Sequence, residues 1–356
     1  MTTALSPRER FEVAARMGVP DKVPFMPFFT GHYVSWFAGV EEGDYWPALE
    51  KKLYAYLKVQ ERWPDLMLYP GIYIDMSVAV EPSALGAPIF FPPDASPQVE
   101  HIANEPDLLL ALEPADPWKD GLMPKALETH QYLLDHCPKR WIDDYGYLAG
   151  SYSCLGPTDV AGLLIGYDNF MRHIYRKPSV AHHLMDVATE TLIRYMRAFE
   201  RVGGPMHRFQ VADDSLAFLS PRHFVEFSLP YLKRIFDEFK GDAVGILHCD
   251  TNATHLLDVI ADIGMDVYNF GPEMDVAEVK EKVGDRVCLF GNIDPLADLL
   301  KGTPGAVEAE SRRILDAAKS KGGFIFTMGS GTARGTPSEN IDAIQAVIDQ
   351  YGRYDV

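Results

Sequence analysis

The carboxyl-terminal half of the chain alternates short apolar runs with longer segments whose apolar residues recur every three to four positions. The short runs predict buried strands and the longer segments predict amphipathic helices. Strands that alternate with helices of this length predict parallel β/α units. The predicted strands cover residues 207–211, 244–248, 266–270, 287–291 and 324–328. The predicted helices cover residues 221–239, 253–263, 276–283, 304–319 and 337–351.

The amino-terminal half has a less regular pattern. Residues 23–29 and 66–74 predict strands that prolines interrupt, the first of them an edge strand or the first strand of a barrel. Residues 145–152 predict a tyrosine-rich strand, and residues 84–93 with 97–102 predict a β-hairpin. Helices are expected at residues 46–62, 122–137, 170–175 and 180–201. No linker composition separates the halves, so one α/β domain over residues 1–356 is expected, with helical and hairpin elaborations in its amino-terminal part.

Charge and cysteine usage narrow the class of protein. The chain has 33 basic and 51 acidic residues, a net charge of −18. Such a surface argues against binding to nucleic acid or to an anionic membrane, and it disfavours a polyanionic substrate unless a local basic pocket exists. The four cysteines are far apart and no stretch approaches the roughly 20 apolar residues of a membrane span. A cytoplasmic protein is therefore expected.

The most informative polar residues follow the apolar run that ends at His248. Side chains alternate along a strand, so His248 and Asp250 point to one face and Cys249 to the other. In α/β barrels the carboxyl ends of the strands gather at the active-site face. A histidine and a carboxylate on one face can bind a metal or transfer a proton. The alternative is a strand-end histidine followed by an aspartate that caps the next helix.

Other predicted strands also end in polar residues. Asp213 and Asp214 follow residues 207–211, and because neighbours point in opposite directions, at most one of them faces a pocket. A catalytic role is one interpretation of this pair, and a helix cap is the other. Asp294 and Pro295 favour a helix cap followed by proline at the first helical position.

The remaining candidates come from several parts of the chain. The Gly329-Ser330-Gly331 turn could bind an anion through its backbone amides, or it could be only a tight turn. Asp75 is a further catalytic candidate because it ends the strand predicted near residue 72. The residues expected to contact a substrate are His32, Tyr33, Tyr152, Asn292 and Ser330.

Several motifs together resemble those of the uroporphyrinogen decarboxylase superfamily. This superfamily also contains the methylcobalamin:coenzyme M methyltransferases and the first methyltransferases of corrinoid O-demethylase systems. The resemblance spans residues 7–351 and implies a (β/α)8 TIM barrel. Its motifs are Pro7-Arg8-Glu9-Arg10-Phe11, Ser220-Pro221 with Phe227-Ser228-Leu229-Pro230-Tyr231-Leu232-Lys233, Phe290-Gly291-Asn292-Ile293-Asp294-Pro295, and Gly329-Ser330-Gly331 with Thr336-Pro337-Ser338-Glu339-Asn340.

The two branches of the superfamily differ in the residues of their sites. The decarboxylases bind a polycarboxylate with an arginine-rich segment, and residues 25–33 contain no arginine, although Asp75 matches the pocket aspartate of that branch. The methyltransferases bind zinc with a His-x-Cys pair and a distant cysteine. His248 matches the histidine of this set, whereas Asp250 and Ser330 stand where the two cysteines would be.

The resemblance implies a corrinoid-dependent methyltransferase of the O-demethylase type. It would move a methyl group from a small, methoxylated aromatic donor to a corrinoid on a carrier protein. His248 and Asp250 would bind Zn²⁺, with Asp213 or Asp214 completing the site. The alternatives are a metal-free decarboxylase of a smaller acid, with Asp75 and His248 as proton donors, and a non-catalytic ligand-binding relative.

Overall fold

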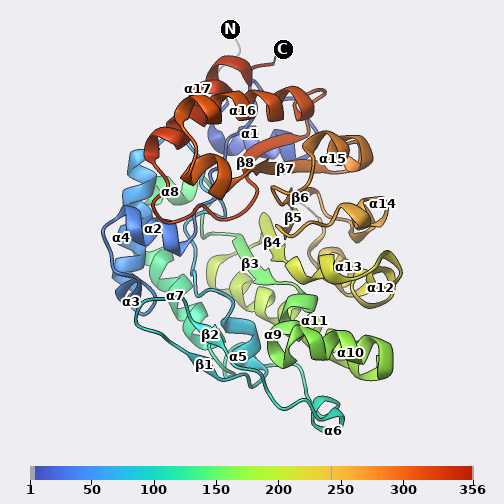
Figure 1. The fold of residues 1–356 in the computed structure, drawn as a ribbon. Helices are drawn as coiled ribbons and strands as arrows, with labels where there is room; N and C mark the ends of the chain where they lie inside the picture. Colours follow the sequence, from blue (N-terminus) through green and yellow to red (C-terminus); the bar gives the residue numbers. More distant parts are fainter. Residues whose placement is uncertain (1–4, 242, 355–356) are drawn as a thin grey trace.

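A parallel sheet lies at the centre of the computed structural model, which describes residues 5–241 and 243–354. The ends of the expected 1–356 domain therefore lie outside the described residues. The sheet has six strands in the order β3-β4-β5-β6-β7-β8, and helices surround it (Figure 1). The strands are β3 (Ser151–Leu155), β4 (Arg208–Ala212), β5 (Val244–Cys249), β6 (Val267–Phe270), β7 (Cys288–Ile293) and β8 (Phe324–Met328).

Two extended segments of the amino-terminal half continue this sheet beyond β8. Phe25 pairs in parallel with Phe326 of β8, and Phe28 pairs in parallel with Tyr69. The prediction of an α/β barrel is thus confirmed, with these segments in its first two strand positions. They form single bridges rather than the continuous strands expected at residues 23–29 and 66–74. Prolines at positions 24, 27 and 70 lack the N–H that a continuous ladder requires.

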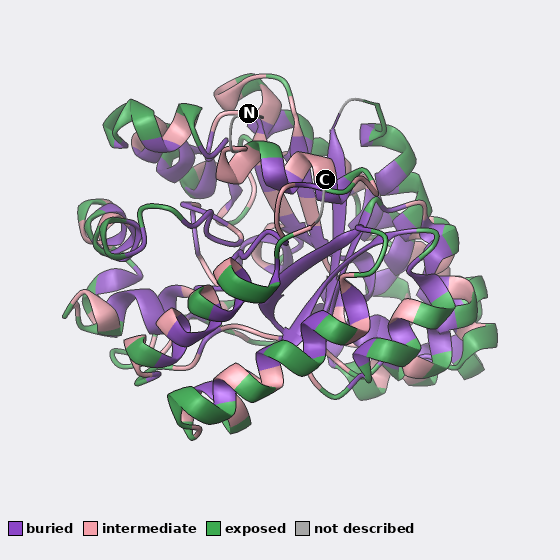
Figure 2. Ribbon diagram, turned by 90° about the horizontal axis from the view of Figure 1, so that it is seen from above, coloured by how far each residue is buried: buried purple, intermediate pink, exposed green. Residues whose placement is uncertain are grey.

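Some amino-terminal helices pack near the first strand positions and others pack against later helices, which cover the outside of the sheet. In Figure 2 the strands and the inward helix faces are buried, whereas the outward faces are exposed. The first group is α1 (Pro7–Ala15), α2 (Gly31–Phe37), α3 (Glu42–Tyr45), α4 (Leu49–Arg62), α5 (Val80–Ala84), α6 (Pro106–Leu109), α7 (Met123–His136) and α8 (Lys139–Asp143). The second is α9 (Pro157–Ile165), α10 (Tyr167–Arg176), α11 (Pro178–Gly203), α12 (Pro221–Phe227), α13 (Leu229–Phe239), α14 (Leu257–Ile260), α15 (Val276–Val283), α16 (Pro304–Ala318) and α17 (Ser338–Tyr351).

Most elements match their predictions in both halves of the chain, and the exceptions have local causes. The hairpin is confirmed by the antiparallel pair β1 (Ile89–Phe90) and β2 (Gln98–Val99). The strand expected at residues 145–152 begins only at Ser151, after Gly146 and Gly150 turn the chain with positive φ angles. The helix expected at residues 253–263 is instead α14 between two short 3-10 turns. Asp294 accepts from the N–H groups of Leu296 and Ala297, which confirms the predicted cap.

Among the described residues, no helix combines the length and the apolar character that a membrane crossing requires.

Candidate metal and substrate site

The candidate site is centred on His248, the fifth residue of β5. Every residue of β5 is buried, and the registers of its neighbours place His248 opposite Ala212 of β4 and Asn269 of β6. Cys249 points the other way, and its thiol lies 3.9 Å from the backbone oxygen of Asp214. The alternation expected from the sequence therefore holds, and the imidazole of His248 faces inward.

Asn269 fixes the orientation and the tautomer of that imidazole. Its amide nitrogen donates to the backbone oxygen of Phe290 at 2.8 Å. Because the nitrogen is used in this way, the amide oxygen faces His248 Nδ1 as an acceptor, and the proton lies on Nδ1. Nε2 of His248 then faces the carboxylates, 3.8 Å from Asp214 Oδ1. A histidine whose other ring nitrogen donates to a neighbour is the usual arrangement of a metal ligand.

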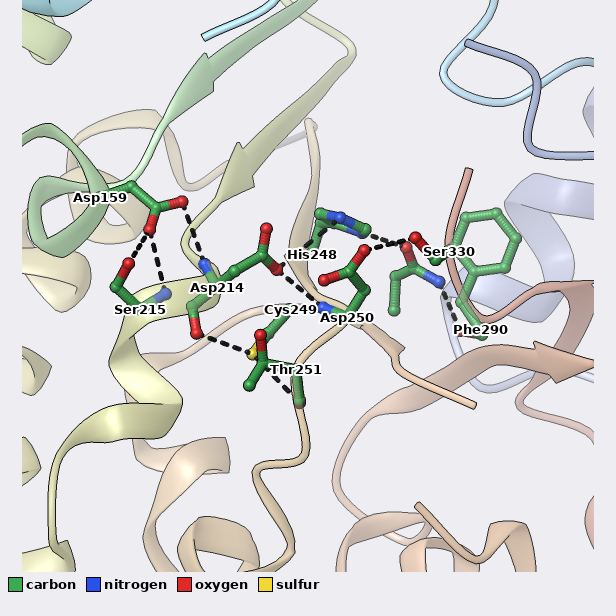
Figure 3. A network of polar contacts seen from close by, with 10 residues as sticks. Asp159, Asp214, Ser215, His248, Cys249, Asp250, Thr251, Phe290 and Ser330 are labelled. Carbon is green, nitrogen blue, oxygen red and sulfur yellow. Dashed lines mark hydrogen bonds and ion pairs between the residues drawn. The ribbon is translucent and has the colours of Figure 1, made fainter. Parts of the chain in front are cut away.

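Three side chains converge at this nitrogen. One potential ligand atom from each of Asp214, His248 and Asp250 lies within 4.8 Å of the other two. Figure 3 shows these side chains turned toward one another, with Ser330 beside Asp250. The hydroxyl of Ser330 donates to Asp250 Oδ2, and the backbone N–H of Asp250 donates to Asp214 Oδ1 at 2.7 Å. The carboxylates therefore come from the ends of β4 and β5, and Ser330 from the end of β8.

The electrostatics of this cluster favour a bound cation. Burial raises the pKa of Asp214 to about 7, an effect that the nearby His248 opposes and the neighbouring Asp159 and Asp250 carboxyls reinforce. Two carboxylates held close together repel when both are ionised, and a divalent cation between them removes that cost. Two oxygen donors and one imidazole nitrogen form a donor set that Zn²⁺ and harder divalent cations accept.

A cavity of about 290 Å³ opens beside Asp214 and His248. Asp75, which is 3% exposed, also lines it and accepts a hydrogen bond from the Tyr45 hydroxyl at 2.9 Å. Gly31 is required here, because a Cβ at this position would lie 2.5 Å from Asp75 Oδ2. His32 lines the same cavity, with Nδ1 3.2 Å from Glu42 Oε1. The apolar and aromatic part of the lining includes Phe28, Trp46, Tyr73, Ile74, Val80 and Ala212.

Lys52 lies behind this wall. Its ammonium group donates to the backbone oxygens of Ile74 and Asp75. Burial lowers the pKa of Lys52 to about 8, although the Asp75 carboxylate opposes the shift. The lysine therefore supports the backbone around Asp75.

Asp213 supports the start of a helix and does not face the cavity. It is fully buried, and its carboxylate accepts from the backbone N–H groups of Thr158 and Asp159 at 3.2 and 2.9 Å, which caps α9. Gly156 allows this contact, because a Cβ there would lie 2.1 Å from Asp213 Cβ. Of the two adjacent aspartates, only Asp214 faces the cavity, as the alternation argument required.

Three of the expected substrate contacts also lie elsewhere. Tyr33 is buried and stacks on Phe29 with a centroid separation of 4.6 Å. The Tyr152 hydroxyl donates to the backbone oxygen of Gly204 at 2.7 Å, on the outer side of the sheet. The amide nitrogen of Asn292 donates to two backbone oxygens in the loop after β6, at 2.8 and 3.1 Å. These side chains are engaged in packing or in loop support and do not line the cavity.

The structure adds three residues that sequence reasoning missed. Asn269 orients His248. Asp159 accepts from the backbone N–H groups of Asp214 and Ser215 at 3.1 and 3.0 Å, and it lines the cavity. Glu81, on α5, also lines the cavity and accepts from the backbone N–H of Leu155 at 2.9 Å. Asn269 could have been noticed as the one amide in an apolar strand, whereas Asp159 and Glu81 lie in segments that were not predicted as helices.

Comparisons with known proteins agree with this architecture. The chain is 26% identical over 303 residues to uroporphyrinogen decarboxylase of Dechloromonas aromatica, covering 81% of this chain and 83% of that protein. It is 33% identical over 186 residues to the enzyme of Cellvibrio japonicus, covering 51% of each. A solved structure, a methyltransferase from Methanosarcina mazei, is similar with a TM-score of 0.82 and 23% identity, covering 98% of this chain and 99% of that one. The family model of uroporphyrinogen decarboxylase matches residues 6–351, so the chain belongs to the uroporphyrinogen decarboxylase family.

Proposed function

We propose that this protein is a methyltransferase that moves a methyl group from a small, methoxylated aromatic donor to a corrinoid. The observation that carries the proposal is the cluster of Asp214, His248 and Asp250 beside a cavity with an aromatic wall. The structural similarity to a protein described as a methyltransferase supports the choice within the family. The absence of arginine from residues 25–33 argues against the polycarboxylate substrate of the decarboxylases.

The three clustered side chains fit a metal. Nε2 of His248 faces the two aspartates, and one carboxylate oxygen of each lies within 4.8 Å of it. Three protein ligands with a fourth position open to the cavity is the pattern of catalytic rather than structural zinc sites. A bound Zn²⁺ would supply Lewis acidity for the ether oxygen of the donor.

The residues of the chain position the donor for displacement. In the proposed displacement the carbon–oxygen bond of the methyl ether would break with its electron pair left on the oxygen, and the new bond to the methyl carbon would use an electron pair supplied by a reduced corrinoid. Phe28, Trp46 and Tyr73 provide an apolar wall for an aromatic ring and exclude water from the reacting bond. Ser330 holds Asp250 in place and is a positioning residue.

The corrinoid is proposed to arrive on a separate carrier protein, which would dock over the mouth of the cavity. His32, whose side chain is 46% exposed, lies among the residues that line this cavity. A carrier must bring its cobalt to the donor methyl group, so the open cavity end is the surface at which such a partner would bind.

The test is metal analysis together with methyl transfer to free cob(I)alamin. The wild-type protein is expected to bind about one zinc ion per chain and to methylate cob(I)alamin from a methoxylated phenol. His248→Ala should lose the metal and at least about a hundredfold in rate, because the neutral nitrogen ligand is removed. His136→Ala is the matched control, since His136 is an exposed histidine on α7.

Retention of the metal and of the transfer rate by His248→Ala would contradict the proposal. So would the absence of both metal and transfer in the wild-type protein across a panel of methoxylated donors.

A second candidate is a metal-free decarboxylase of a smaller acid, favoured by the burial of Asp75 against the cavity and its hydrogen bond from Tyr45. Release of carbon dioxide that a chelator leaves unchanged, and that Asp75→Asn abolishes, would support this alternative in place of methyl transfer.

A further inference from the structure

Most of the ionisable side chains that line the cavity are acidic. Asp75, Glu81, Asp159 and Asp214 line it, and no lysine or arginine among the described residues does. His32 and His248 are the lining residues that could carry a positive charge. Apart from any cation at the Asp214–His248–Asp250 cluster, a ligand in this space therefore meets four carboxyl groups and no lysine or arginine side chain.

Glu81 is a member of this set that lies outside the Asp214–His248–Asp250 cluster. It belongs to α5, and the backbone N–H of Leu155 holds one of its oxygens at the end of β3. β4 separates β3 from β5, so the strand end that Glu81 contacts is not adjacent to the strand of His248. Its carboxyl group also interacts with the backbone N–H of Glu81 itself, and the residue is only 4% exposed.

The surroundings of Glu81 are poor in groups that could balance a negative charge. Desolvation raises the pKa of Glu81 to about 7, the N–H of Leu155 opposes the shift, and Asp159 adds to it. Gln210, which also lines the cavity, has a buried amide oxygen without a partner among the described side chains and backbone. This part of the cavity offers hydrogen-bond acceptors and a carboxyl group, which suit a hydroxyl or an amine and repel a carboxylate.

We propose that the cavity selects methyl donors that carry no carboxylate, and that Glu81 sets this selection at the end of the donor remote from the methyl group. The inference rests on the proposed function in that it treats the ligand as a methyl donor. The selectivity itself is a property of ligand binding and does not require methyl transfer. Uncharged and cationic methoxyphenols enter the cavity, whereas methoxybenzoates are excluded by the four carboxyl groups. Glu81 and Gln210 then hydrogen-bond a polar hydrogen of the accepted ring.

The experiment compares three ligands that share one methoxyphenol ring and differ in the group para to the hydroxyl: guaiacol with a hydrogen, vanillate with a carboxylate and vanillylamine with an aminomethyl cation. Dissociation constants are measured by calorimetry on the protein as purified and after chelation, with no corrinoid present. Chelation removes any cation that a carboxylate could ligate directly. Vanillate is expected to bind at least about tenfold more weakly than guaiacol in both preparations, and vanillylamine at least as tightly as guaiacol, because the charges of ligand and cavity decide the order.

Glu81→Gln keeps the shape and a hydrogen-bonding group and removes the charge. The ratio of the vanillate and guaiacol dissociation constants is expected to fall at least about threefold in this variant, as charge repulsion is reduced. Glu50→Gln changes an exposed glutamate on α4 and should leave the ratio as in the wild type. Asp75→Asn also removes a carboxylate from the cavity and should lower the same ratio. It therefore tests the charge argument if Glu81→Gln does not fold.

Equal or tighter binding of vanillate than of guaiacol by the wild type would overturn the inference, as would failure of all three ligands to bind. If the ratio of the vanillate and guaiacol dissociation constants is unchanged in Glu81→Gln, the claim that Glu81 sets the selection is wrong. If guaiacol binds selectively but no methyl group reaches cob(I)alamin, the selection stands and the proposed methyl transfer fails, so the two failures are distinguishable.

Discussion

At the scale of single residues, Asn269 decides which nitrogen of His248 faces the cavity. Asn269→Leu keeps a similar volume but removes the acceptor for His248 Nδ1 and the donor to Phe290. The imidazole can then rotate or change tautomer, so zinc affinity is expected to fall about 10- to 100-fold. Competition with a fluorescent chelator measures this affinity directly.

Asn340→Leu is the control for that prediction. Asn340 is 1% exposed and its amide donates to the backbone oxygens of Leu299 and Gly302, away from the cluster. Both variants should lower the free energy of unfolding, but only Asn269→Leu should lower zinc affinity. An equal loss of affinity in both would mean that Asn269 acts through general stability.

Glu81 makes stability depend on pH. Its folded-state pKa of about 7 lies above the usual 4.5 of a glutamate, so its contribution to stability is fully present below about pH 4.5 and is lost as the pH rises through about 7. At pH 8 the ionised group is buried without a counter-charge. Glu81→Gln should therefore gain stability relative to the wild type between pH 5 and pH 8, by at most about 3 kcal/mol. Urea unfolding at both pH values measures the difference, and a parallel pair of curves would contradict the assignment.

At the scale of elements, the sequence predicted the short buried strands and the amphipathic helices well, and the uniformly buried helix α9 poorly. The strands from β4 to β8 coincide with their predicted runs, because each is a short apolar stretch between periodic helices. Helix α9 was missed because almost every one of its residues is buried, so it has no polar face and no helical period. Asp159 was missed with it, and Glu81 was missed because α5 is only five residues long.

The pairing of Asp213 and Asp159 shows how these missed elements hold the site together. Asp213 caps α9, while Asp159 of α9 accepts from the backbone of Asp214 and Ser215. Asp213→Ala removes two hydrogen bonds at the start of α9 and should lower the free energy of unfolding by about 1–2 kcal/mol. Asp213→Asn retains an acceptor oxygen and should lose less. Denaturant unfolding checks the order, and equal losses in both variants would show that the charge, not the cap, is what matters.

For the whole molecule, the sequence predicted the barrel and the position of its site, but not the composition of that site. Alternation placed His248 and Asp250 together because strand geometry alone fixes that relation. It could not place Tyr33, Tyr152 or Asn292, since which face of a segment meets the cavity depends on how distant segments pack. The lining charges combine residues from α5, α9, the loop before α5 and the end of β4, and no local pattern links them.

The charge of the cavity and of the chain leads to a prediction about the activity that names the family. Uroporphyrinogen is a polycarboxylate, and the protein has a net charge of −18 and a cavity of about 290 Å³ lined by four carboxyl groups. Each substrate carboxylate would lose its hydration without gaining an arginine or lysine partner, which is strongly unfavourable. Anaerobic incubation with uroporphyrinogen should therefore give no decarboxylated porphyrinogen by chromatography, at enzyme concentrations at which an authentic decarboxylase completes the reaction. Formation of such a product would contradict both the charge argument and the assignment to methyl transfer, because the same cavity would then have to accept several carboxylates at once.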